Sequence, residues 1–88
     1  MRIVVGQIRV RWVTVPESQE AVEAAIASLG VPWTVWPAAH RWPGGERAVV
    51  VLEFLVPTPG SAAWKLVDRL KADGVWLTGY YEEVHPYG

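Results

Sequence analysis

The stretch RAVVVLEFLV, residues 47–56, consists almost entirely of apolar residues. Valine, leucine and phenylalanine dominate it, and such side chains favour an extended strand. A run that is apolar on both of its sides is typical of a strand covered on both faces of its sheet. We therefore expect residues 47–56 to form a central strand.

A helix is expected directly after this strand. Thr58 supplies a helix cap and Pro59 a first-turn proline, while Gly74 ends the helix. Residues 75–84 then form the last strand. The apolar stripe of the helix, spaced by three and four residues, comprises Ala63, Leu66, Val67 and Leu70.

A similar strand and helix precede the central strand. Apolar and polar side chains alternate through residues 3–15, as in a half-buried strand. Pro16, Glu17 and Ser18 then open a helix that Gly30 ends, with acidic residues in its first turns where the helix dipole favours them. Its apolar stripe comprises Val22, Ala25, Ile26 and Leu29.

Residues 31–36 form the remaining strand. Pro32 cannot donate a ladder hydrogen bond, which indicates an edge strand or a strand start. We expect residues 37–45 to be a loop, with a turn at residues 43–45, Pro-Gly-Gly.

The resulting order is β-α-β-β-α-β. Two strand–helix–strand units with right-handed crossovers place both helices on the same face of the sheet. The sequence therefore predicts a ferredoxin-like α+β sandwich, a four-stranded antiparallel sheet with two helices on one face. Residues 1–88 are expected to form this single domain.

The face of the sheet away from the helices, called the open face below, carries the more specific information. Strand alternation assigns a largely apolar and aromatic set to it, and exposed apolar patches of this kind mark partner surfaces. Because two-fold homodimers are the commonest assembly, we expect self-association through this face. The expected interface residues are Arg9, Arg11, Trp36, Val49, Val51, Leu55, Trp76 and Tyr80.

Composition and charge exclude several classes of function. A net charge of −1 disfavours a nucleic-acid binder, and the chain has no cysteine for thiolate chemistry. His40 and His85 lie at no metal-ligand spacing and are expected to be exposed. We predict no catalytic residue, metal or cofactor. No apolar run approaches the roughly 20 residues of a membrane span, so the expected location is the cytoplasm.

Residues 54–75 resemble the opening of an ACT domain. A strand, the Pro59-Gly60 turn, an alanine- and leucine-rich helix and a glycine before the next strand correspond to that family, although Thr58 stands where it usually has an acidic residue. Residues 45–55 similarly resemble the third strand of a NIL domain. The ACT resemblance implies a regulatory module that binds an amino acid or similar ligand at a subunit interface. Amide groups at the helix start also favour an anion, which points to Thr58, Gly60 and Ser61 as ligand-binding residues.

Two other functions remain open at this point. A dimeric α+β-barrel enzyme or carrier would enclose an aromatic or apolar molecule in a pocket lined by Arg9, His40, Trp76 and Tyr80. A single-stranded RNA binder would use the topology of the RNA-recognition motif, but Val49 and Val51 stand where its stacking aromatics should be. The acylphosphatases share the fold as well, yet residues 13–18 lack the arginine of their phosphate loop.

Overall fold

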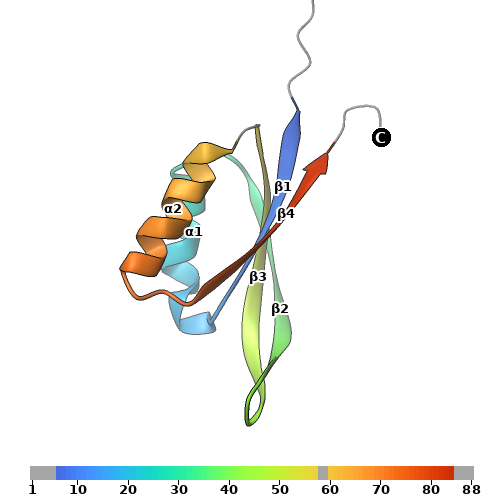
Figure 1. The fold of residues 1–88 in the computed structure, drawn as a ribbon, viewed down its shortest axis with the longest axis vertical. Helices are drawn as coiled ribbons and strands as arrows, with labels where there is room; N and C mark the ends of the chain where they lie inside the picture. Colours follow the sequence, from blue (N-terminus) through green and yellow to red (C-terminus); the bar gives the residue numbers. More distant parts are fainter. Residues whose placement is uncertain (1–5, 58–59, 85–88) are drawn as a thin grey trace, which may run out of the picture.

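A four-stranded antiparallel sheet carries both helices on one of its faces (Figure 1). The computed structural model describes residues 6–57 and 60–84. The strand order is β2-β3-β1-β4, so the predicted ferredoxin-like α+β fold is confirmed. In chain order the elements are β1 (Gln7–Thr14), the 3-10 turn η1 (Pro16–Ser18), α1 (Gln19–Ala27), β2 (Trp33–Trp42), β3 (Gly45–Pro57), α2 (Ser61–Ala72) and β4 (Leu77–Val84).

The hydrophobic core lies between the sheet and the helices. Alternate residues of β1 are buried, as the period of two predicts. At the centre, the ring centroids of Trp12 and Phe54 are 4.9 Å apart in an edge-to-face arrangement, a favoured geometry for aromatic pairs. The two helices add small and branched side chains above this pair. The core comprises Ile8, Val10, Trp12, Val22, Ile26, Val50, Leu52, Phe54, Val56, Ala63, Val67, Leu70 and Leu77.

The prediction of a loop over residues 37–45 is wrong. Strand β2 continues to Trp42, and its ladder with β3 runs from the Trp33–Phe54 pair to the Trp42–Gly45 pair. Pro37 is tolerated inside the strand because β2 is an edge strand, paired on one side only. The turn itself is where the sequence places it, between Trp42 and Gly45.

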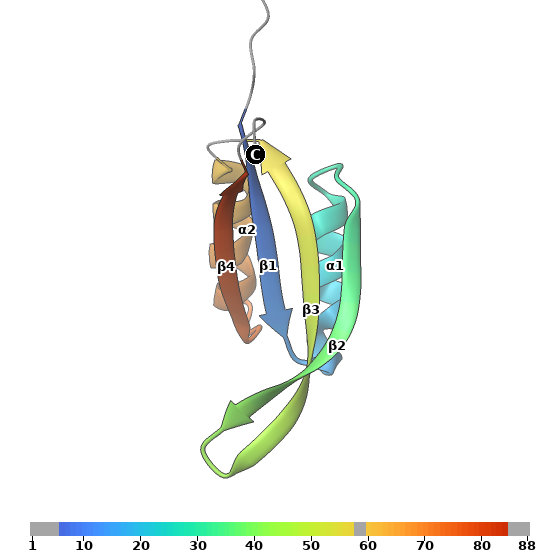
Figure 2. The ribbon, with the colours of Figure 1, turned by 90° about the vertical axis from the view of Figure 1, so that its right-hand side faces the viewer.

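The β2–β3 hairpin reaches beyond the rest of the sheet. Thr14, the last residue of β1, pairs with Val50, whereas β2 and β3 remain paired as far as Gly45. Figure 2 shows the hairpin passing the end of β1 and swinging across toward the side of β4. The molecule is accordingly elongated, 55 × 26 × 19 Å. The twist therefore brings side chains of the hairpin over the open face.

Candidate functional site: the open face of the sheet

Strand register confirms the predicted side of the sheet for the candidate interface residues. Arg9 lies opposite Leu55, and Arg11 lies between Glu53 and Tyr80. Trp36 lies opposite Val51. All of these alternate with the buried residues that face the helices, so they belong to the open face. That this face is an interface between subunits stays a prediction.

One end of this face carries a network of ion pairs, which we call the charged end: Arg9, Arg11, Glu53 and Glu82. The Arg9 Nε lies 3.1 Å from Glu53 Oε1, and its Nη1 lies 3.4 Å from Glu82 Oε2. The Arg11 Nε lies 3.6 Å from Glu53 Oε2. These pairs cross between neighbouring strands of one chain, so no second copy is needed to neutralise the arginines.

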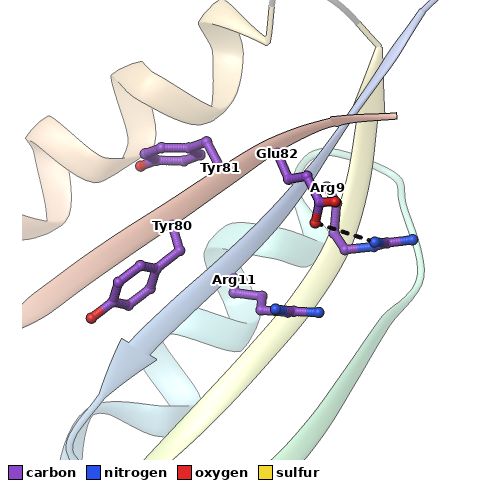
Figure 3. A pocket seen from close by; sticks show the side chains of 5 residues that line it. All are labelled: Arg9, Arg11, Tyr80, Tyr81 and Glu82. Atoms are coloured by element: carbon purple, nitrogen blue, oxygen red, sulfur yellow. Dashed lines mark hydrogen bonds and ion pairs between the residues drawn. The ribbon is translucent and has the colours of Figure 1, made fainter. Parts of the chain in front are cut away.

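A small hollow of about 220 Å³ adjoins the charged end at the β4 edge. Tyr80 and Tyr81 extend to opposite sides of β4, while Arg9 and Arg11 project from β1 (Figure 3). Tyr81 contacts Trp64 of α2, with ring centroids 4.1 Å apart, and so belongs to the helix side. Arg9 and Tyr80, two of the residues expected in an enclosed pocket, thus share only a shallow hollow here.

The other end of the face carries an aromatic cluster, which we call the aromatic end: His40, Trp42 and Trp76. Ring centroids are 4.6 Å apart for Trp42 and Trp76, and 4.9 and 5.6 Å for His40 with Trp42 and Trp76. The Arg47 guanidinium lies 5.9 Å from the centre of the Trp42 ring. His40 is therefore a half-buried strand residue, which corrects the prediction of an exposed loop histidine.

Two valines of β3 on this face are more buried than an uncovered sheet face predicts. Val49 and Val51 have exposed fractions of only 2% and 9%, although no helix covers their side of the sheet. The hairpin that begins beyond Val49 twists across the end of β1 and holds Trp42 against Trp76. The two valines lie on the predicted face, but they leave little surface for a partner.

A hydrogen bond from Thr14 holds Trp76 in place directly before β4. The Thr14 hydroxyl, which is fully buried, donates to the Trp76 carbonyl oxygen at 2.6 Å. The cluster is absent from the sequence-based prediction, because His40 and Trp42 lie in the residues predicted to form a loop. A period of two over His40 and Trp42, continuing from Trp36, was the available signal.

The residue before α2, Gly60, has to be a glycine for structural reasons. Gly60 has a φ of +73°, and a Cβ there would lie 3.3 Å from Ile8 Cδ1 and 3.4 Å from Val56 Cγ2. Its carbonyl oxygen accepts hydrogen bonds from the amides of Ala63 and Trp64. Ser61 is exposed, and Thr58 lies outside the described residues. The predicted ligand-binding role of Thr58, Gly60 and Ser61 stays a prediction.

A larger groove lies at the opposite end of the face from the aromatic cluster. It has a volume of about 680 Å³ and is lined by Gln7, Arg9, Val31, Pro32, Trp33, Thr34, Glu53, Phe54, Leu55 and Pro57. Both Arg9 and Glu53 of the charged end reach it. No pattern in the sequence predicts this groove, because it depends on where β2 begins relative to the end of β3.

Residues 6–57 and 60–84 bring no three His, Cys, Asp or Glu side chains together as metal ligands. Within the same residues, no helix combines the length and apolar character needed to cross a membrane.

Comparison with known proteins gives similarities at the level of structure alone. No family model matches the sequence, and no curated protein matches it. A DUF3240 family protein from Shewanella baltica superimposes with a TM-score of 0.76 at 11% identity, covering 93% of each chain. A putative PII-like signalling protein from Thermus thermophilus gives 0.66 at 21% identity, covering 96% of this chain and 91% of that one.

A third similar structure has ligands bound. It is a nitrogen regulatory PII-like protein from Thiomonas intermedia, bound to ADP, AMP and bicarbonate. Its TM-score is 0.68 at 12% identity, covering 94% of this chain and 100% of that one. At these identities the similarity establishes the fold. The chain thus has the ferredoxin-like fold that PII-like regulatory proteins adopt.

Proposed function

We propose that this protein is a non-catalytic regulatory domain that self-associates through its open face and binds a small, amino-acid-like ligand near that interface. The fold supports this proposal, since similar structures include signalling and nitrogen regulatory proteins, one of them holding small ligands. We take the cytoplasm as its compartment.

The observation that carries self-association is the remaining exposed apolar surface of the open face. Trp36, Leu55 and Tyr80 have exposed fractions of 37%, 40% and 54%. Tryptophan and tyrosine are enriched in protein interfaces, where their large apolar area is buried. The charged end adds two positive and two negative side chains, which cancel. Two copies can therefore approach through this face without net repulsion from these groups.

Light scattering tests self-association with a matched pair of variants. Trp36 and Val35 are neighbours in β2, each 37% exposed, and they point to opposite faces of the sheet. We expect the wild-type protein to be a dimer, Trp36→Asp to be a monomer, and Val35→Asp to remain a dimer. Circular dichroism of each variant checks that it is folded. A monomeric wild type, or equal dissociation of both folded variants, contradicts the proposal.

The ligand is proposed to contact the start of α2. Backbone amides in the first turn of a helix attract an anionic group such as a carboxylate. We expect Ser61→Glu to weaken binding by repelling that group, and Ser61→Ala to preserve it, because the amides are unchanged. Calorimetric titration with a panel of amino acids measures both variants. Equal affinity for all three proteins would remove Thr58, Gly60 and Ser61 from the site.

A further inference from the structure

The groove at the charged end arises from a mismatch in strand length. Strand β2 begins at Trp33, opposite Phe54, whereas β3 continues to Pro57. Leu55 and Pro57 therefore extend past the start of β2, and the chain arriving from α1 leaves a groove of about 680 Å³ beside them. Small-molecule sites commonly have volumes of about 300–1,000 Å³.

One wall of the groove is apolar and firmly held. Trp33 lines the groove from the helix side of the sheet, because it lies opposite Phe54, and it is half-buried against the hydrophobic core. Pro32 and Pro57 have no backbone N–H to donate, and Leu55 adds an exposed aliphatic side chain. This wall suits a large apolar or aromatic group.

The other wall carries one positive and one negative side chain. Arg9 and Glu53 both line the groove, with Nε and Oε1 3.1 Å apart, and their side chains are 36% and 24% exposed. Each also pairs outside the groove, Arg9 with Glu82 and Glu53 with Arg11. The network is therefore already neutral.

Charge complementarity selects the class of ligand. A polyanion such as a phosphate ester would face Glu53, and the lining residues include no lysine to offset that repulsion. A ligand with one ammonium and one carboxylate adds no net charge. Its carboxylate can pair with Arg9 and its ammonium with Glu53, and hydrogen bonds to charged groups are the stronger kind.

We propose that this groove binds an α-amino acid with a large apolar side chain. The inference rests on the proposed small-ligand function and moves the ligand from the start of α2 to the groove. The charged groups of the amino acid lie at Arg9 and Glu53, and its side chain lies against Trp33, Leu55 and the two prolines.

Calorimetric titration of the full chain with L-phenylalanine and two truncated analogues tests the charge pattern. Phenethylamine lacks the carboxylate, and 3-phenylpropionate lacks the ammonium. We expect each analogue to bind at least about tenfold more weakly than phenylalanine, since each leaves one charged group of the groove without its ligand partner. Affinity for either analogue equal to that for phenylalanine overturns the proposal, as does absence of binding by phenylalanine, tryptophan and leucine.

Two pairs of variants locate the site. Arg9→Gln and Glu53→Gln alter the groove and should lower the affinity for phenylalanine at least about tenfold. Glu82→Gln and Arg11→Gln alter the same ion-pair network outside the groove and should change it by less than about threefold. Equal effects of all four variants would overturn the assignment.

The two ligand sites are distinguished by the same titration. If Ser61→Glu abolishes binding while Arg9→Gln and Glu53→Gln do not, the ligand lies at the start of α2. The groove proposal then fails and the proposed function stands. If no amino acid binds while light scattering shows a dimer, the groove proposal fails and self-association stands.

Discussion

The two ends of the open face differ in how their side chains are covered. At the aromatic end, the β2–β3 hairpin passes beyond β1 and packs Trp42 against Trp76, so Val49 and Val51 are buried by their own chain. At the charged end β3, β1 and β4 are paired side by side, and arginine and glutamate side chains remain partly exposed. The molecule thus covers its most apolar surface itself and leaves the charged end accessible to ligands or partners.

The largest effect is expected at the aromatic end. Trp76→Ala removes the ring that contacts both Trp42 and His40. We expect a loss of about 2 kcal/mol in the free energy of unfolding, less than for a fully buried tryptophan because Trp76 is half-buried. Urea denaturation measures it.

Tyr80→Ala is the matched control for this variant, because Tyr80 lies on the same face of the sheet, four residues after Trp76. Both removals are measured in the monomeric Trp36→Asp background. Tyr80 is 54% exposed in a single chain, so its removal there should cost less than about 0.5 kcal/mol. Equal losses for the two variants would mean that the aromatic end has no special role in covering the sheet.

A smaller effect is expected from the hydrogen bond that anchors the cluster. Thr14→Val keeps the side-chain shape but leaves the Trp76 carbonyl oxygen without the hydroxyl donor. We expect a loss of about 1 kcal/mol. Thr78→Val, in the half-buried part of the open face, should change the free energy of unfolding by less than about 0.5 kcal/mol. A neutral Thr14→Val would show that water replaces the hydroxyl at this carbonyl.

The arrangement of the sheet was predictable from local patterns. Alternation in β1 and the apolar run of β3 identified the faces correctly, because the side-chain period of a strand fixes them once the helices are placed. The turn at residues 43–45 was also recognised, since glycine is required there: Gly44 has a φ of +99°.

The hairpin was not predictable in the same way. Pro37 and the two alanines after it lower strand propensity, and only pairing with β3 keeps residues 37–42 extended. The contact of Trp42 with Trp76 spans distant parts of the chain and depends on sheet twist. The groove likewise depends on the offset between the start of β2 and the end of β3, and no local sequence pattern predicts that offset.

The smallest effect on the free energy of unfolding is expected at the charged end. Unlike the effect at the aromatic end, it should depend on the salt concentration. Glu53→Gln removes the carboxylate shared by Arg9 and Arg11, both of which are substantially exposed. Exposed ion pairs contribute little, so we expect a loss of about 0.5 kcal/mol at low ionic strength. The loss should shrink in about 1 M sodium chloride, where charges are screened over about 3 Å.

The loss caused by Trp76→Ala should persist in that salt, because burial of apolar surface does not depend on charge screening. Urea denaturation of both variants at low and high salt makes the comparison. Glu46→Gln, at the exposed tip of the hairpin, controls for the general effect of removing a negative charge. A salt-independent loss for Glu53→Gln would show that Glu53 stabilises the sheet by packing rather than by its charge, and the two ends of the face would then differ in shape alone.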